Sequence, residues 1–216
     1  MPDFLDENTR MRLEPILASL VNPVKLVFFR QKEACSSCLE QEELLKAVKA
    51  LSSKINLEVY DFVLNGDEVN NYKIDKIPAT AVVGSRDFGI RFYGLTAGYE
   101  FSSLLEDIIM VSNERSGLDP RLEIMVKSIA YRVHLQVMVN LTCPYCARMV
   151  HVAHQFAFAS ENVKADMVEL TEFPYFAQRY NVTGVPKTMV NEGYSFVGAI
   201  PADALYMEIR RAVGYS

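Results

Sequence analysis

The stretch Cys143-Pro144-Tyr145-Cys146 decides the fold. Residues 134–140 before it form an apolar run that predicts a buried strand, and residues 146–159 have helical spacing. A thiol at a helix N-terminus faces unpaired backbone N–H groups and the positive end of the helix dipole, which both favour the nucleophilic thiolate. We therefore expect Cys143 to be the attacking thiol and Cys146, on the same helical face, to be the resolving thiol.

A second pair, Cys35-Ser36-Ser37-Cys38, follows another apolar run and precedes the helical pattern of residues 38–51. The same argument places Cys35 at a helix N-terminus as nucleophile, with Cys38 as its partner. The two pairs contain every cysteine of the chain. In a reducing compartment such cysteines are catalytic or metal-binding more often than structural.

Zinc is the rival interpretation, because two such pairs can supply four thiolate ligands. Zinc-binding pairs usually stand about 15 to 20 residues apart, and these two are far more widely separated. His151 and His154 are three residues apart on an expected helix and could share a metal. No carboxylate is in helical register with them, so surface or groove histidines are favoured. We expect no metal site.

Composition limits the cellular compartments and the binding partners that are expected for the protein. Half of the residues are hydrophobic, the formal net charge is -5, and no run of Lys or Arg suggests a nucleic-acid or anionic-lipid surface. The N-terminus lacks the features of a secretory signal, and no apolar stretch approaches the roughly 18 residues that cross a bilayer. We expect a folded cytoplasmic protein that binds neither nucleic acid nor membrane.

The chain repeats itself. Pro78 follows Cys35 by 43 residues, and Pro186 follows Cys143 by the same 43. A period this long indicates a duplicated domain. The polar residues 113–117 are the expected boundary, which gives domains 1–115 and 116–216.

Each half predicts the order α-β-α-β-α-β-β-α, with the last two strands forming a hairpin. The expected helices are residues 3–20, 38–51, 68–72, 97–112, 122–129, 146–159, 173–180 and 201–212. The expected strands are residues 24–29, 56–64, 81–83, 90–93, 134–140, 163–170, 189–191 and 195–199.

This order of motifs carries a resemblance. A Cys-x-x-Cys at a strand-to-helix turn, followed by Ile77-Pro78-Ala79-Thr80 or Val185-Pro186-Lys187-Thr188 before a hairpin and a final helix, resembles the thioredoxin fold. Two such units with one thiol pair each resemble the glutaredoxin-like protein disulfide oxidoreductases. The resemblance implies an α/β protein of two tandem thioredoxin-like domains, each a mixed central sheet flanked by helices.

The resemblance also implies further site residues. Pro78 and Pro186 would be cis-prolines beside the thiol pairs, and the backbone of Ile77 and Val185 would pair with an extended substrate like an added strand. Separately, the position of Tyr145 between the cysteines predicts that its ring shields the disulfide and packs against substrate, and an ordinary surface side chain is the alternative. The first pair departs from the usual motif, since it lacks both proline and aromatic residue.

Proton transfer needs a separate group. The buried aspartate of thioredoxins is absent, because Phe29 and Val137 occupy its positions. Asp61 and Glu169 recur near the ends of the strands that follow the thiol helices, where a carboxyl can shuttle the proton of the resolving thiol. A solvated carboxylate at a strand end is the simpler interpretation and is favoured for both.

The expected activity is thiol:disulfide exchange with protein substrates, extended more weakly to disulfide isomerisation. No Gly-x-Gly-x-x-Gly follows a strand, so no cofactor is expected to be bound. Electrons would come from glutathione or from an external flavoprotein resembling thioredoxin reductase. Two alternatives stay open. One is an electron-relay module for a peroxide-reducing system, which by resemblance keeps one working thiol pair, and the other is a non-enzymatic redox sensor.

Overall fold

The structure, a computed structural model, describes residues 5–33 and 35–214. The N-terminal half runs α1 (Glu7–Ala18), β1 (Val24–Arg30), α2 (Cys38–Ala50), β2 (Ile55–Asp61), α3 (Gly66–Tyr72), β3 (Ala79–Val83), β4 (Asp87–Tyr93) and α4 (Glu100–Asn113). The C-terminal half runs α5 (Pro120–Lys127), β5 (Val133–Val139), α6 (Pro144–Ala159), β6 (Val163–Glu169), α7 (Pro174–Arg179), β7 (Lys187–Val190), β8 (Tyr194–Val197) and α8 (Ala202–Ala212). The expected order of elements is confirmed in both halves.

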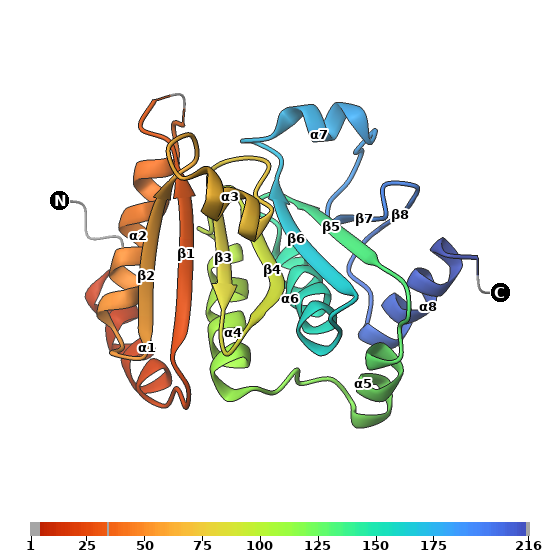
Figure 1. The fold of residues 1–216 in the computed structure, drawn as a ribbon, viewed down its shortest axis with the longest axis horizontal. Helices are drawn as coiled ribbons and strands as arrows, with labels where there is room; N and C mark the ends of the chain where they lie inside the picture. Colours follow the sequence, from red (N-terminus) through yellow and green to blue (C-terminus); the bar gives the residue numbers. More distant parts are fainter. Residues whose placement is uncertain (1–4, 34, 215–216) are drawn as a thin grey trace.

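The eight strands form one mixed sheet in the order β2-β1-β3-β4-β6-β5-β7-β8 (Figure 1). Within the first half, β1 pairs in parallel with β2 and antiparallel with β3, and β3 and β4 form the hairpin. The second half repeats this pattern. The halves join because β4 and β6 pair in parallel. The mixed sheet expected in each half is present, and the β4–β6 pair joins the two into one continuous sheet.

Local sequence signals fix the beginnings of several helices. Asp6 caps α1, since its carboxylate accepts a hydrogen bond from the Thr9 backbone N–H at 2.7 Å. Asp119 caps α5 in the same way, and Pro120 occupies the first helical position, where its missing N–H costs no hydrogen bond. Residues 114–119 connect the two halves, and the expected division between residues 115 and 116 falls within them.

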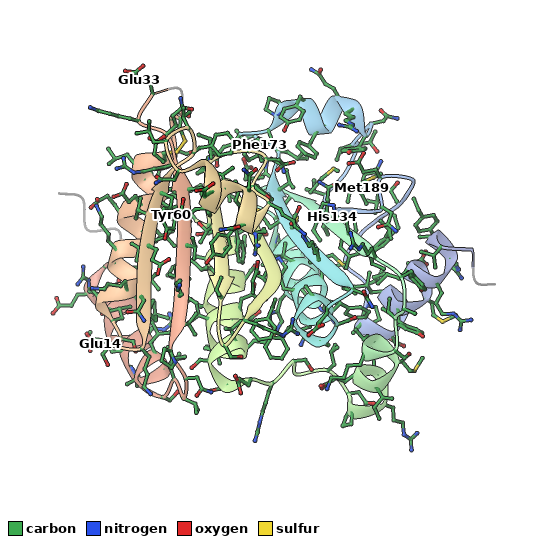
Figure 2. All side chains as sticks on the ribbon, viewed as in Figure 1. Glu14, Glu33, Tyr60, His134, Phe173 and Met189 are labelled. Atoms are coloured by element: carbon green, nitrogen blue, oxygen red, sulfur yellow. A yellow bond between two sulfur atoms is a disulfide. The ribbon has the colours of Figure 1, made fainter. Side chains whose placement is uncertain are left out.

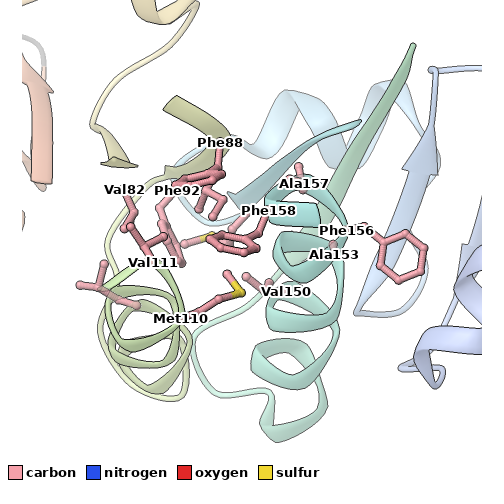
Figure 3. Packing of buried hydrophobic residues seen from close by; sticks show 14 of the residues in the cluster. Val82, Phe88, Phe92, Met110, Val111, Val150, Ala153, Phe156, Ala157 and Phe158 are labelled. Atoms are coloured by element: carbon pink, nitrogen blue, oxygen red, sulfur yellow. The ribbon is translucent and has the colours of Figure 1, made fainter. Parts of the chain in front are cut away.

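The main core extends across the boundary between the halves. Figure 3 shows side chains of β4 and α4 packed against those of α6, and the rings of Phe88 and Phe158 stack with centroids 4.4 Å apart. Phe92 and Val150 are fully buried in the same cluster. Because this packing and the β4–β6 pairing both cross the boundary, helix α6 is held against the first half. Among the described residues, no helix is long and apolar enough to cross a membrane.

Candidate redox sites

The Cys143–Cys146 pair lies where β5 ends and α6 begins. Cys143 is the N-cap of α6, so it lies at the helix N-terminus as expected, and Pro144 is the first residue of the helix. The two cysteines form a disulfide with Cα atoms 5.4 Å apart. Cys146 is fully buried, whereas Cys143 is partly exposed. Of the two cysteines of this pair, only Cys143 is accessible from solvent.

The Cys35–Cys38 pair has the same bond and the same Cα separation but a different relation to its helix. Helix α2 begins only at Cys38, with Ser37 as its N-cap. The expectation that Cys35 occupies the helix N-terminus is thus wrong. The physical reason is that the first pair has no proline, the residue whose fixed φ suits the first turn of a helix. The Ser37 hydroxyl donates a hydrogen bond to the Glu172 carboxylate of the other half. The helix dipole acts mainly within the first turn, so it stabilises a Cys35 thiolate less than a Cys143 thiolate.

The peptide bonds Ile77–Pro78 and Val185–Pro186 are both cis, the geometry expected from the sequence. The Cys143 Sγ lies 3.9 Å from the carbonyl oxygen of Val185, so this loop borders the second thiol pair directly. In the first half, β3 begins at Ala79, which is paired with Phe29 of β1. That pairing brings Ile77 and Pro78 to the end of β1 that leads into the first thiol pair.

Tyr145 stands between the cysteines of the second pair with 68% of its side chain exposed. Val197 of β8 is 56% exposed. An exposed ring beside the partly exposed Cys143 is available for contact with a partner's side chains.

The two carboxyl groups expected at equivalent strand ends have different surroundings. The Asp61 carboxylate accepts hydrogen bonds from the backbone N–H groups of Val63 and Leu64, at 2.9 and 3.1 Å, and so stabilises the turn after β2. Glu169 is buried, and its Oε2 accepts a bond from the Glu172 backbone N–H at 2.9 Å. Its Oε1 has no hydrogen-bond partner among the described residues. Burial raises the pKa of the Glu169 carboxyl above its ordinary value.

Sequence reasoning missed a third acid, Glu100, in the first turn of α4. Its side chain is fully buried, and burial raises the pKa of Glu100 to about 7. The Ser103 hydroxyl lies 2.8 Å from Glu100 Oε2 and 3.4 Å from the Ala147 carbonyl oxygen, which places Glu100 beside the first turn of α6. Its relation to the second thiol pair depends on packing between the halves. The one available signal is its spacing with Ser103 and Asp107 on a single helical face.

Asp107 on that face joins α4 to the two histidines of α6. It lies 3.1 Å from His151 Nδ1 and hydrogen-bonds to His154 Nδ1. Burial alone would raise the pKa of Asp107, but the two histidines hold it below its ordinary value. Surface or groove positions were expected for both histidines, and this is wrong for His154, which is fully buried. Its carboxylate partner comes from another helix, which the spacing within one helix does not reveal.

No group of three or more metal-binding side chains occurs among the described residues. A cavity of about 590 Å³ lies on the sheet and is lined by Arg91, His134, Lys164 and Asp166, among others. Figure 2 shows His134 on the face of the sheet. His134 and Lys164 lie near the starts of β5 and β6, whereas the thiol pairs follow the ends of β1 and β5. The cavity is therefore separate from both thiol pairs.

Comparison with known proteins agrees with this geometry. Residues 133–210 match the family model described as a thioredoxin domain. The whole chain is similar to the crystal structure of a protein disulfide oxidoreductase from Aeropyrum pernix, with 30% sequence identity and a TM-score of 0.92. The match covers 99% of this chain and 96% of that one.

More distant relatives belong to larger proteins. The chain is 25% identical over 188 residues to the alkyl hydroperoxide reductase AhpF of Escherichia coli, and 22% identical over 192 residues to an NADH dehydrogenase of Bacillus subtilis. These matches cover 87% and 89% of this chain but only 34% and 35% of the relatives, so the chain spans about a third of their length. The structure of AhpF from Enterococcus faecalis shares the fold, with a TM-score of 0.90 at 24% identity, and the match covers 96% of this chain and 100% of that one.

Proposed function

Because the chain belongs to the family of protein disulfide oxidoreductases built from two tandem thioredoxin-fold units, we propose that it exchanges dithiols and disulfides with protein substrates. The observation that carries the proposal is the pairing, in each Cys-x-x-Cys, of a partly exposed first cysteine with a buried second one. That arrangement separates the sulfur that meets substrate from the sulfur that resolves the intermediate.

The reaction starts from the reduced second pair. The Cys143 thiolate attacks a substrate disulfide, forms a mixed disulfide and releases one substrate thiolate. The Cys146 thiolate then attacks Cys143 Sγ, which reforms the Cys143–Cys146 bond and releases the second substrate thiolate. The substrate gains two electrons, and the pair is oxidised. The Val185 carbonyl beside Cys143 Sγ supports docking of an extended substrate segment along Val185 and Pro186.

Cys146 must lose a proton before it attacks, and it is buried away from water. Glu169 is our candidate acceptor, since a buried carboxyl with a raised pKa is a better base near neutral pH than an ordinary one. Glu100, beside the first turn of α6, is a second buried carboxyl in the same region. The proposal does not extend to Asp61, because its carboxylate is used by the turn after β2.

The source of electrons is proposed to be a flavoprotein of the thioredoxin reductase type, or glutathione. Similarity to the alkyl hydroperoxide reductase AhpF proteins favours one second candidate, an electron relay in a peroxide-reducing system. The retention of a disulfide at both thiol pairs favours general disulfide exchange over a relay with a single pair. Isomerase activity is a weaker extension of the same chemistry.

The test is reduction of insulin disulfides with dithiothreitol as electron donor. The wild-type chain should turn over many times, Cys143→Ser should abolish the contribution of the second pair, and Cys35→Ser that of the first. Ser53→Ala, an exposed position in the turn before β2, is the matched control and should keep full activity. A folded wild-type chain that shows no turnover would refute the proposal and leave the redox sensor in its place.

A further inference from the structure

The segment that carries the first thiol pair is hydrogen-bonded to a carboxylate from the other half of the chain. The Ser37 hydroxyl, immediately before Cys38, donates a hydrogen bond to Glu172 Oε2. The other carboxylate oxygen, Oε1, accepts a hydrogen bond from the Leu95 backbone N–H at 2.5 Å. Figure 2 shows Phe173, the next residue in the chain, at the same end of the sheet as Glu33 in the loop before the first pair. A charged group of the C-terminal half is thus fixed beside a residue that lies between the two cysteines.

Several contacts hold this carboxylate in place. Glu172 lies three residues after the end of β6, and the β4–β6 pairing brings β6 next to the first half. Gly94 has a φ of +106°, and a Cβ there would lie 2.7 Å from Glu169 Cβ and 3.0 Å from Glu172 Oε1. Only glycine therefore lets the chain pass so close to Glu172. The same segment is tied to α2, because the Thr96 backbone N–H donates to Gln41 Oε1 at 2.8 Å.

The second pair has different groups at the corresponding positions. Pro144 and Tyr145 replace the two serines, and the Tyr145 ring is exposed. Cys143 caps α6, whereas Cys35 precedes the N-cap of α2. The positive end of a helix dipole therefore favours the Cys143 thiolate, while the first pair has a fixed carboxylate on Ser37, two residues after Cys35.

Other charged groups around the first pair do not cancel this contribution. Arg30 at the end of β1 is ion-paired with Glu42 of α2, with Nε and Oε2 3.0 Å apart. Along the chain, Lys32, Glu33 and Glu40 flank the pair, and Glu169 lies three residues before Glu172. Three of these four are acidic, so the local balance does not favour a thiolate.

We propose that Glu172 is a positioning residue that disfavours the Cys35 thiolate and makes the first pair the more reducing of the two. This inference rests on the proposed function, because it assigns a direction to exchange between the sites. Electrons then pass from the Cys35/Cys38 dithiol to the Cys143–Cys146 disulfide, within a chain or between chains. The Cys35–Cys38 bond forms, the Cys143–Cys146 bond breaks, and two electrons and two protons end on Cys143 and Cys146.

The test uses the full chain with Cys143 and Cys146 replaced by serine, so that only the first pair reacts. Glu172→Gln removes the charge but keeps the shape, since an amide can accept from Leu95 N–H and donate to the Ser37 hydroxyl. The rate of alkylation of Cys35 by iodoacetamide is measured as a function of pH. In the Glu172→Gln variant the Cys35 thiol should have a lower pKa than in the parent chain, and its alkylation rate at pH 7 should be about 3- to 10-fold higher. In equilibrium with glutathione at pH 8.5, the ratio of dithiol to disulfide at the first pair should be about fivefold higher in the Glu172→Gln variant than in its parent. At pH 6 the ratio should be the same in both proteins, because their thiols are protonated.

Two variants separate charge from structure. Glu172→Asp keeps the charge while withdrawing it from its hydrogen bonds, so the Cys35 pKa should stay near the wild-type value. Glu161→Gln removes an exposed carboxylate at the other end of β6 and should change nothing. An unchanged Cys35 pKa in Glu172→Gln, or an equal shift in Glu172→Asp, would overturn the inference. The alkylation result is independent of turnover, so a wild-type chain that fails to reduce insulin would refute the proposed function separately.

Discussion

The Glu100→Gln substitution should stabilise the chain more at neutral and alkaline pH than at acid pH. Burial raises the pKa of Glu100 from the ordinary 4.5 to about 7. Each unit of pKa difference between the folded and unfolded states corresponds to about 1.4 kcal/mol. The folded protein binds this proton more tightly, so the contribution of Glu100 to stability is fully present below about pH 4.5. It is lost as pH rises through about 7, and the total loss is about 3 kcal/mol.

Glutamine cannot ionise and keeps nearly the same shape. Its advantage over Glu100 in the free energy of unfolding should therefore grow by about 2 to 3 kcal/mol between pH 5 and pH 8.5. The measurement is urea unfolding of the oxidised wild-type and variant chains at both pH values. Titration of Asp107 and Glu169 is common to both proteins and largely cancels in the difference.

Glu14→Gln is the matched control, because Glu14 is an exposed carboxyl on α1 (Figure 2). Its difference from wild type should be the same at both pH values. A Glu100→Gln difference that is equally independent of pH would refute the reasoning, since it would mean that Glu100 titrates normally in the folded protein.

Three further outcomes are expected. Phe158→Ala should lower the free energy of unfolding by about 3 to 5 kcal/mol, because it removes the ring stacked on Phe88 between the halves; equal midpoints in denaturant would contradict this. Asp107→Asn should let the pKa of His151, which the Asp107 carboxylate raises, fall toward its ordinary value in an NMR titration, and a constant value would exclude the pairing. Glu169→Gln should slow insulin reduction at pH 7 about tenfold and shift its pH profile, whereas a uniform loss at every pH would indicate a structural effect only.

Much of the fold could be predicted from the sequence because its signals are local or periodic. Apolar runs before both cysteine pairs and the equal spacing from Cys35 to Pro78 and from Cys143 to Pro186 give the order of elements and the cis-prolines. The joining of the two sheets could not be predicted in this way. Residues of β4 and β6 have the same apolar character whether they pair with each other or are covered by a helix.

The site residues could also be predicted only where the signal is local in the sequence. The four cysteines stand out by residue type and spacing, but Glu100 and Glu172 reach their neighbours only through contacts between the halves. Sequence reasoning named the two disulfide pairs and Glu169, and it missed Glu100 and Glu172.

The β4–β6 pairing has a consequence for anyone who separates the two halves. In each half expressed alone, β4 or β6 would become an edge strand of the sheet, because its partner strand is missing. The unpaired backbone N–H and C=O groups of such edge strands promote aggregation. Precipitation of a truncated chain would therefore be explained by its exposed edge strand. It would give no information about the reactivity of the cysteines. Charged replacements on the outer strand, or a short strand supplied in trans, are the remedies that would keep a half in solution.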